Sequence, residues 1–376
     1  MVLKRLELKN YKNLTEVFEF ADCTNVLIYP NGWGKTNLLE AIDYLSSLKS
    51  FRGLRDADLL DWDADDTFVS LKTKLSNRKS VELEVIISSR QETQNRIAKA
   101  KTKTNTKVKT RKTVKINGAN TTPKKFKTQL STFFYSPHNA DIVSSTPDIR
   151  RNQFDRFISE FDENYDKLLK EYKFVLRSRN KLLSRINEGR EDEIQLDYWD
   201  SRFVELGERI LTKRLGLLDD LDQFIKQASD ELYKSGLDLE VVYSSKVVDK
   251  DIMILGDKIG NNRMKEIAAG MTLYGPHRDD YDFLLKNNLL RDTGSRGQQR
   301  IAGIVLLYAL NGLFYEQFSA RPILLFDDVF SELDDKHRVN IEKSLQKLEN
   351  QVFVTSSQRE LFTDGFLQEA FNVVSL

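Results

Sequence analysis

The sequence predicts an α/β fold, a mixed sheet with flanking helices, into which an antiparallel helical lobe is inserted. Residues 25–29 form an apolar run that enters a glycine-containing loop, and an amphipathic segment with helical spacing leaves that loop. Residues 150–235 contain no proline and consist largely of long amphipathic stretches, whereas strand-like alternation returns in residues 237–245. The helical stretch is therefore expected to interrupt a sheet-containing domain.

The composition is that of a globular protein with a substantial core and a heavily charged surface. Of 376 residues, 40% are hydrophobic and 31% are charged, so one large or two ordinary domains are expected. The 58 Lys and Arg residues almost balance the 57 Asp and Glu residues, so net charge alone does not indicate a polyanionic partner. The single cysteine, Cys23, excludes an intrachain disulfide and a cysteine-based zinc site, which points to a reducing compartment.

Nothing in the sequence indicates a membrane segment or secretion. No apolar run approaches the roughly 20 residues of a membrane span. The amino terminus alternates like a strand and lacks the apolar core of a signal peptide. Three widely separated histidines make a histidine-rich metal site improbable. We therefore expect a soluble cytoplasmic protein.

The first 90 residues carry the strand and helix signals of the head. Leu6 and Leu8 alternate with charged residues and precede "VFEF" (17–20), which predicts an antiparallel hairpin. Apolar residues recur at helical spacing in 38–48. Residues 68–75 and 81–88 are expected to add strands to a sheet.

A basic segment follows at residues 96–115, with nine Lys or Arg and no acidic residue. On a strand, its alternation would place the charged groups on one face. One interpretation is a solvated hairpin whose lysines protect an exposed sheet edge. The other is a surface that contacts the phosphate backbone of DNA. The candidate DNA-binding residues are Lys99, Lys101, Lys103, Lys107, Lys109 and Arg111.

Two amphipathic stretches, residues 160–186 and 197–233, are joined by the polar "NEGREDE" and predict an antiparallel helical arm. Their apolar stripes are expected to be packing faces and not cofactor sites. The predicted domains are an N-terminal part of the head (1–149), the helical arm (150–236) and a C-terminal part of the head (237–376).

The loop "IYPNGWGKTN" (28–37) nearly matches the phosphate-binding pattern G-x-x-x-x-G-K-[ST], with Tyr29 at its first position. Backbone N–H groups and the helix dipole favour phosphate at such a helix start. Lys35 is expected to reach the β- and γ-phosphates, and the Thr36 hydroxyl to ligate magnesium. The expected nucleotide-binding residues are Tyr29, Pro30, Asn31, Gly32, Trp33, Gly34, Lys35, Thr36 and Asn37.

A second element of the site lies in "RPILLFDDVFSELDD" (321–335), a short apolar strand that ends in two carboxylates. In P-loop ATPases the first such carboxylate, here Asp327, holds magnesium, and a neighbouring one, here Asp328, polarises the attacking water. Asp328 and Lys35 are therefore the predicted catalytic residues. A strand that simply ends in an acidic turn is the alternative, and the upstream loop disfavours it.

The third element decides the class of ATPase. Ser295, Arg296, Gly297 and Gln298 stand directly before a strongly apolar helix. Ser-x-Gly-Gln at a helix start is the signature of the ATP-binding-cassette superfamily, in which it addresses the γ-phosphate of ATP bound to the other subunit. "SELD" (331–334) resembles the D-loop, and "QVFVTSS" (351–357) resembles the strand that leads to the switch region. The expected architecture is an ABC-type P-loop ATPase head.

Further blocks resemble the RecF family, bacterial recombination and repair ATPases related to the heads of SMC proteins. The resemblance rests on "NGWGKTNLLEAIDYLSSLKSFR", "YKFVLRSRNKLL", "DYWDSRF", "LYGPHRDDYDF", "GSRGQQR" and "ILLFDDVFSELDD". It implies ATP-dependent homodimerisation, ATP and Mg²⁺ as cofactors, and binding to gapped or junction DNA. It also implies cooperation with RecR and RecO in helping RecA replace single-strand-binding protein, with weak, DNA-stimulated hydrolysis of ATP as a timer.

This sequence departs from the family pattern at three places. Tyr29 replaces the first glycine of the loop, Trp33 replaces a small residue, and residues 136–139 read Ser-Pro-His-Asn where the family carries two acids. An aromatic residue at position 29 either hinders the loop or points outward and stacks on the base. We expect binding to be retained, because every direct phosphate and magnesium ligand remains.

The alternative function is a nucleotide-insensitive repair scaffold whose pocket Tyr29 and Trp33 have closed. A transporter subunit is disfavoured by the basic segment and the inserted arm, and a nuclease by the lack of a further acidic metal cluster. Two pairs of residues stay open: Arg150 and Arg151 either contact DNA or cap the arm, and His277 with Arg278 is expected to be a hydrogen-bonded structural pair. Arg52 is either a phosphate-facing arginine or a surface residue.

Overall fold

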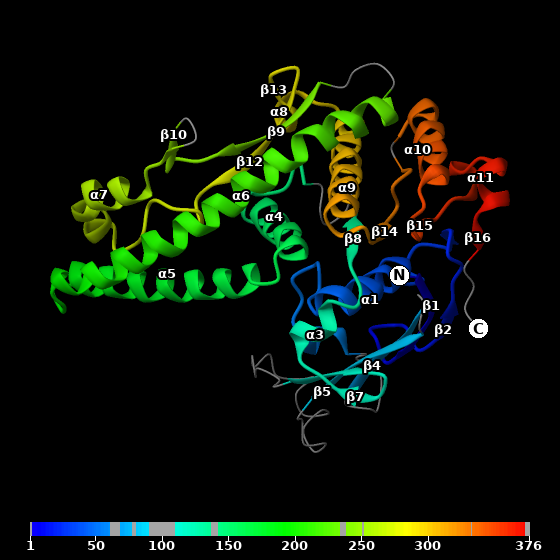
Figure 1. Ribbon diagram of the computed structural model, residues 1–376, viewed down its shortest axis with the longest axis horizontal. Helices are drawn as coiled ribbons and strands as arrows, with labels where there is room; N and C mark the ends of the chain where they lie inside the picture. Colours follow the sequence, from blue (N-terminus) through cyan, green and yellow to red (C-terminus); the bar gives the residue numbers. More distant parts are fainter. Residues whose placement is uncertain are drawn as a thin grey trace. The chain divides into compact units, whose positions relative to one another are not determined.

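A computed structural model describes residues 2–60, 68–76, 80–89, 110–136, 142–233, 238–249, 252–331 and 333–372 (Figure 1). The chain forms two compact units. The first comprises Met1–Asn139, Glu231–Tyr233 and Phe314–Leu376, and the second Ala140–Asp230 and Lys234–Leu313. Residues 238–313, assigned above to the head, group here with the helices of the arm, so the compact units do not follow the three predicted segments.

The first unit contains a six-stranded antiparallel sheet in the order β2-β1-β4-β5-β6-β7. Its strands are β1 (Val2–Lys9), β2 (Val17–Glu19), β4 (Phe68–Ser76), β5 (Val81–Ser89), β6 (Thr110–Ile116) and β7 (Ala119–Asn120). Leu6 and Leu8 of β1 are buried and alternate with charged residues, as one-sided burial of a sheet requires. The predicted hairpin β1–β2 and the strands at 68–75 and 81–88 are confirmed.

The second sheet of this unit is parallel, in the order β16-β3-β15-β14-β8. Its strands are β3 (Thr24–Ile28), β8 (Thr132–Tyr135), β14 (Ile323–Phe326), β15 (Val352–Ser356) and β16 (Phe371–Asn372). All residues of β14 and β15 are buried, as expected for strands covered on both faces. Because the strands are parallel, the loops after β3, β14 and β15 meet at one edge of the sheet.

Helix α1 (Lys35–Ser47) contacts both sheets and belongs to their shared core (Figure 1). Its Leu38, Leu39, Ile42 and Leu45 are fully buried, which confirms the predicted apolar face. The unit also contains η1 (Asp56–Leu59), α3 (Pro123–Lys127), α10 (Asp335–Lys347), η4 (Arg359–Leu361) and α11 (Asp364–Glu369). The helix that starts at the loop is therefore anchored by the hydrophobic core.

The second unit is the helical arm with a small sheet. Helices α4 (Pro147–Phe161), α5 (Tyr165–Asn187) and α6 (Leu196–Tyr233) are followed by α7 (Leu255–Ala269). A turn with η3 (Glu193–Gln195) joins α5 to α6, and the rings of Tyr172 and Phe203 stack between them at 5.2 Å, so the predicted antiparallel pair is confirmed. The remaining elements are β9 (Leu239–Ser244), β10 (Val248–Asp249), β11 (Ile252–Met253), β12 (Asp280–Leu285), β13 (Asn288–Leu289) and α8 (Leu290–Thr293).

A buried ionic cluster holds α5, α6 and α7 together. The Arg179 side chain is fully buried and donates to Asp200 Oδ1 at 2.7 Å and to Glu266 Oε2 at 2.6 Å. It also donates to Thr272 Oγ1 at 2.8 Å, and its guanidinium lies 5.4 Å from the ring of Phe203. One cation of α5 therefore contacts groups from three other segments of the arm, namely α6, α7 and the chain after α7.

Helix α9 (Arg296–Phe318) corrects the statement that no apolar run of the sequence approaches the length of a membrane span. Among the described residues it is the one helix, 23 residues long with an 18-residue stretch of mean hydropathy 1.3, whose length and composition are sufficient to cross a membrane. However, 72% of this apolar stretch is buried inside the protein. The helix passes from the second unit into the first, and its apolar character is that of a core helix.

Candidate nucleotide-binding site

Both glycines of the loop between β3 and α1 have a left-handed backbone conformation. Gly32 and Gly34 adopt positive φ angles of 84° and 114°, which favour glycine. At Gly34 a Cβ atom would also stand 2.9 Å from Asn13 Nδ2 and 3.0 Å from Leu14 Cδ2. The second glycine of the pattern is therefore required both by conformation and by close packing, and it places the N-terminus of α1 at the loop.

The ammonium group of Lys35 lies against the loop that it follows. Its Nζ donates to the carbonyl oxygens of Tyr29 at 2.6 Å and of Pro30 at 3.0 Å. Burial lowers the pKa of Lys35, and the nearby carboxylates of Asp328 and Asp327 oppose that shift. The cation is therefore held against the carbonyl oxygens at the start of the loop.

Asp327, directly after β14, is the centre of a hydroxyl cluster at the sheet edge. Thr36 Oγ1 donates to its Oδ2 at 2.8 Å and Ser136 Oγ to the same oxygen at 3.3 Å, while Thr355 Oγ1 donates to Oδ1 at 2.7 Å. Asp327 is only 2% exposed. The structure thus brings together the two residues predicted to hold magnesium, Thr36 and Asp327, although they are 291 positions apart.

The second carboxylate of the pair, Asp328, adopts a left-handed backbone conformation with φ of 48°. This region costs free energy for a residue other than glycine. The Asp328 N–H donates to Thr355 Oγ1 at 3.0 Å, and its carbonyl oxygen accepts from Ser331 Oγ at 2.9 Å. The strained turn that carries the predicted water-polarising residue is therefore fixed on both sides.

Sequence reasoning missed Thr355 and Asn13. Thr355 bonds both Asp327 and the backbone of Asp328, and its only sequence signal is a polar residue in the apolar run "QVFVTSS". Asn13 donates to the carbonyl of Trp33 at 3.0 Å and accepts from Asn37 Nδ2 at 2.7 Å. These contacts tie the loop to the β1–β2 connection.

Arg52 is part of a second cluster at the same helix. Its Nη1 donates to Asn37 Oδ1 at 3.3 Å and lies 4.0 Å from the fully buried Glu40, which also pairs with Lys12. The Arg52 side chain is 25% exposed. The arginine is thus anchored beside the predicted nucleotide-binding residue Asn37 and is not a free surface group.

The two aromatic residues of the loop stack on each other. The rings of Tyr29 and Trp33 lie 3.8 Å apart at an interplanar angle of 9°, and Phe18 meets Trp33 edge-on at 6.1 Å. Both rings are half-buried and pack against the hydrophobic core of the first unit. The first and fifth positions of the loop, both unusual, therefore form one aromatic pair.

The signature segment caps α9 in the way its composition predicts. The N–H of Ser295 donates to Gln298 Oε1 at 2.9 Å, and the N–H of Gln298 donates to Ser295 Oγ at 3.3 Å, which is a capping box. Ser295 and Arg296 are exposed, and Gly297 and Gln298 are half-buried. The helix N-terminus in the second unit thus presents these residues to solvent, where another molecule can reach them.

The comparisons with known proteins agree with this geometry. Residues 2–375 match the family described as the RecF/RecN/SMC N terminal domain. The "DNA replication and repair protein RecF" of Bacillus cytotoxicus is 32% identical over 366 residues, which cover 95% of this chain and 92% of that protein. The chain belongs to the RecF family. The RecF protein of Halothermothrix orenii is 31% identical over 353 residues, covering 90% of this chain and 88% of its own.

Solved structures give the same assignment. A structure described as the recombination mediator protein RecF with ATP in the RecFOR pathway is 27% identical, with a TM-score of 0.80, and covers 96% of this chain and 93% of its own. An SMC head bound to the C-winged helix domain of ScpA has a TM-score of 0.53 at 13% identity, which shows a shared fold only. The predicted SMC- and RecF-type head with long inserted helices is confirmed.

The RecF-family block "GPHRDD" (275–280) makes structural contacts within the second unit, although Arg278 is exposed and His277 and Asp280 are half-buried. His277 Nδ1 lies 2.8 Å from the Tyr172 hydroxyl, and burial lowers the pKa of His277 to about 4. Arg150 is 2% exposed and pairs with Asp280 through Nε at 2.8 Å and Nη2 at 2.6 Å. Arg151 Nη1 donates to the Asp279 carbonyl at 2.6 Å. Of the two roles left open for Arg150 and Arg151, these contacts favour the structural one.

Most of the predicted DNA-binding residues lie outside the described residues. These are Lys99, Lys101, Lys103, Lys107 and Lys109, and the same holds for residues 137–139 of the segment that departs from the RecF pattern. Arg111 is described and exposed on β6. Its neighbours Lys112 and Lys115 pair with Asp56 at 3.1 Å and with Glu84 at 2.9 Å, as in an ordinary charged sheet surface.

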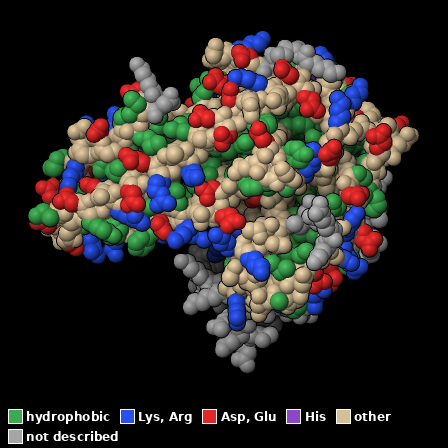
Figure 2. All heavy atoms as spheres, in the orientation of Figure 1, with side chains coloured by type: hydrophobic (Ala, Val, Ile, Leu, Met, Phe, Trp, Pro, Cys, Tyr) green, Lys and Arg blue, Asp and Glu red, His purple; other side chains and the backbone are tan. Residues whose placement is uncertain are grey.

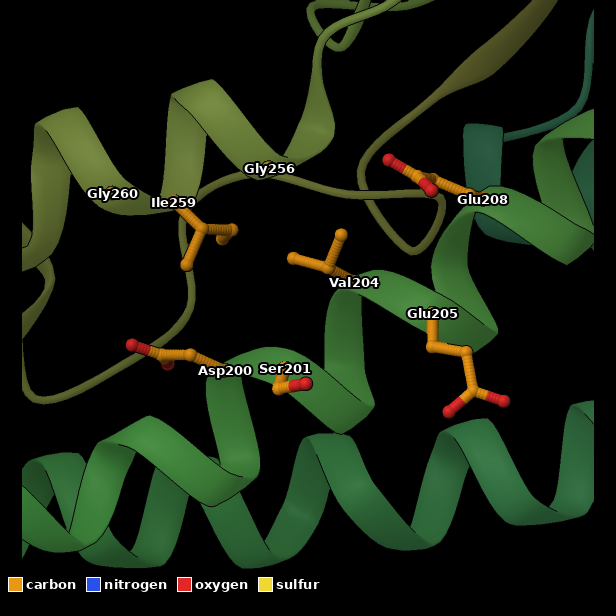
Figure 3. A pocket seen from close by; sticks show the side chains of 8 residues that line it. All are labelled: Asp200, Ser201, Val204, Glu205, Glu208, Gly256, Ile259 and Gly260. Atoms are coloured by element: carbon orange, nitrogen blue, oxygen red, sulfur yellow. The ribbon is translucent and has the colours of Figure 1, made fainter.

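A cavity of ≈ 460 Å³ lies in the second unit between α6 and α7 (Figure 3). It is lined by Asp200, Ser201, Val204, Glu205, Glu208, Gly256, Ile259 and Gly260. Three carboxylates make this lining unsuitable for a triphosphate, because like charges repel. This cavity therefore does not have the character expected of a triphosphate site.

Proposed function

We propose that this chain is an ATP-dependent DNA-binding protein of recombinational repair and replication-fork maintenance. It dimerises around ATP at gapped DNA or at single-strand/double-strand junctions, and with RecO and RecR it helps to load RecA. It acts in the cytoplasm. The observation that carries the proposal is the meeting of Lys35, Thr36 and Asp327 at one sheet edge, in a chain that belongs to the RecF family.

The residues at this edge suit ATP with Mg²⁺. Thr36 and Asp327 offer a hydroxyl and a carboxylate 2.8 Å apart, and Mg²⁺ usually takes one or two carboxylates together with phosphate oxygens and water. Bound magnesium would neutralise charge on the phosphates. Among the described residues no group of three or more His, Cys, Asp or Glu could hold a metal by itself, which fits a site completed by the nucleotide.

Hydrolysis of ATP to ADP and phosphate is proposed to be slow and stimulated by DNA. Asp328 orients the attacking water, and Lys35 binds the transferred phosphate. The hydrogen bonds of Thr355 to the Asp327 carboxylate and to the backbone N–H of Asp328 support this division of roles, because they fix the Asp327 carboxylate relative to the turn that carries Asp328. Ser295 to Gln298 would complete the site from the other subunit.

We expect the exposed signature serine to decide dimerisation and not nucleotide affinity. In sedimentation with Mg²⁺ and ATP, the wild type should shift from monomer to dimer, whereas Ser295→Arg should stay monomeric. Its Kd for ATP should remain within about threefold of wild type, because the P-loop of the same chain is intact. Ser201→Arg, the same change at another exposed serine of the second unit, should dimerise normally. Dimerisation of Ser295→Arg at wild-type ATP concentrations would contradict the head-to-tail arrangement.

The alternative function, a nucleotide-insensitive scaffold, is tested at the aromatic pair. An aromatic stack contributes about 0.5–1.5 kcal/mol, so Tyr29→Gly and Trp33→Ser should each weaken ATP binding by about two- to tenfold. The double variant should be no weaker than the single ones, since the stack is lost only once. Tyr29→Phe should bind ATP like the wild type. Titration calorimetry provides the measurement. If the wild type does not bind ATP and the Tyr29→Gly variant does, the result would instead support the nucleotide-insensitive scaffold.

A further inference from the structure

The two long helices of the arm carry opposite charge. Helix α5 has seven basic residues and two acidic ones, a difference of 7 − 2 = +5. Helix α6 has five basic residues and nine acidic ones, a difference of 5 − 9 = −4. Figure 2 shows Lys and Arg side chains gathered along the lower edge of the arm, where α5 runs. The arm therefore has one strongly basic edge.

Five of the seven basic residues of α5 lie on one exposed face of the helix, which we call the α5 basic face. It comprises Lys170, Lys173, Arg177, Lys181 and Arg185, and all five are exposed. They follow each other at intervals of three or four residues, which places neighbours on the same side of a helix. At a rise of about 1.5 Å per residue the face extends over roughly 22 Å. The two acidic residues of α5, Asp166 and Glu171, are only half-exposed.

Four of these cations have no acidic partner within the part of the chain that the structure describes. No hydrogen bond or ion pair is formed by Lys170, Lys173, Arg177 or Lys181 to a described residue. On α6, by contrast, Arg202 pairs with Glu205 at 2.6 Å and Lys213 with Asp162 at 2.9 Å. Unpaired, aligned charge of one sign is typical of a surface that binds a polyanion.

An exposed aromatic side chain stands within this basic face. Phe174 directly follows Lys173, is 57% exposed and contacts the ring of Trp199 at 6.3 Å. Proteins that bind single-stranded nucleic acid combine a positive track for the backbone with aromatic side chains on which bases stack. A duplex keeps its bases stacked inside, so an exposed phenylalanine favours an unpaired strand.

We propose that the α5 basic face, with Phe174, binds single-stranded DNA. The proposal rests on the DNA-binding function proposed above and names the surface of the second unit that performs it. An anionic membrane is disfavoured because the apolar face of α5, including Leu169, Tyr172 and Leu183, is buried in the arm and cannot insert into lipid. The Phe174 side chain makes an acidic protein the poorer match.

The test compares two variants with the same change in charge. In the first, Lys170, Lys173, Arg177 and Lys181 of α5 are all replaced by Gln. In the matched control, Arg202, Arg209, Lys213 and Lys226 of α6 are all replaced by Gln. Fluorescence anisotropy with a labelled oligo-dT strand and a duplex of equal length, at several salt concentrations and saturating ATP, gives affinity and salt dependence. Helix content from circular dichroism checks that both variants fold.

We expect the α5 variant to bind oligo-dT at least tenfold more weakly than the control variant. Its plot of log affinity against log salt should flatten by about 0.7 for each lost phosphate contact. Phe174→Ala should weaken oligo-dT binding about fivefold or more without changing that slope. The duplex should be affected less than oligo-dT by both changes.

Several results would overturn the inference. If the α5 variant has the same salt dependence of binding as the wild type, the α5 basic face is not part of the DNA interface. If both quadruple variants lose the same affinity for oligo-dT, the α5 residues act only through long-range charge. Two results together would indicate an acidic protein partner. In the first, poly-glutamate displaces labelled oligo-dT from the wild type as effectively as unlabelled oligo-dT does. In the second, Phe174→Ala leaves the affinity for oligo-dT unchanged. A wild type that binds DNA while the α5 variant is unaffected refutes only this inference, whereas a wild type that binds no DNA refutes the proposed function as well.

Discussion

Replacing Lys35 by Ala is expected to abolish ATP binding and, with it, ATP-dependent dimerisation. The Lys35 ammonium lies beside the loop backbone, 2.6 Å from the Tyr29 carbonyl, where burial already lowers its pKa. A triphosphate would give this poorly solvated cation a partner of opposite charge, and charge-assisted contacts of this kind are strong. We expect a loss of at least about a hundredfold in affinity, or about 2.7 kcal/mol.

The measurement is titration calorimetry with Mg²⁺ and ATP, followed by thermal unfolding. ATP should raise the melting temperature of the wild type, because a ligand that binds only the folded state stabilises it. It should leave the melting temperature of Lys35→Ala unchanged. Lys74→Ala, at an exposed lysine of β4, is the control and should behave like the wild type. An affinity of Lys35→Ala within threefold of wild type would place the nucleotide elsewhere.

Comparing Lys35→Ala with Ser295→Arg separates nucleotide binding from dimerisation, two steps that an assay of dimerisation alone does not distinguish. Lys35 acts on the nucleotide of its own chain, whereas the signature is proposed to act on the nucleotide of the other subunit. A mixture of the two variants is therefore informative. In a mixed pair, the Ser295→Arg chain supplies an intact P-loop and the Lys35→Ala chain supplies an intact signature, so one complete site remains. Weak ATP-dependent heterodimers are therefore expected, although each variant alone stays monomeric.

The sequence predicted those parts of the site that depend on local structure. The loop at 28–37, the acids after β14 and the cap of α9 are each set by a short stretch of chain, so residue type and spacing suffice. Thr355 and Asn13 could not be found in this way. Their contacts exist because parallel strands end at one sheet edge and because the β1–β2 connection reaches the loop.

The aromatic pair shows the same limit within a single loop. Tyr29 and Trp33 were each recognised as unusual, but their stacking depends on the conformation of the chain between them, where Gly32 has a positive φ angle. The division into two compact units shows the same limit of sequence-based prediction for the whole chain. The alternation at 237–245 predicts that a strand follows the arm, but not that it pairs with residues 280–285 or that this sheet groups with the helices of the arm.

The arm depends on a buried ionic cluster that should be sensitive to the loss of one member. Arg179 is fully buried, and its partners Asp200 and Glu266 are 15% and 0% exposed. Removing one partner of a buried pair costs about 3–5 kcal/mol, because the remaining charge is left without compensation. The Glu266 side chain also accepts from the Leu273 N–H at 2.7 Å, so it is fixed in place and cannot turn toward water.

Arg179→Met is therefore expected to lower the free energy of unfolding of the arm by about 3–5 kcal/mol, even though methionine fills much of the same volume. Urea unfolding followed by circular dichroism and tryptophan fluorescence gives the value. Arg177→Met, two residues away on the exposed face of α5, should change the free energy of unfolding by less than about 0.5 kcal/mol.

Adding Glu266→Gln to Arg179→Met should restore part of the loss, because the amide keeps an acceptor for the Leu273 N–H without a buried charge. If the double variant is no more stable than Arg179→Met alone, packing around Arg179, and not the unpaired carboxylate, accounts for the loss.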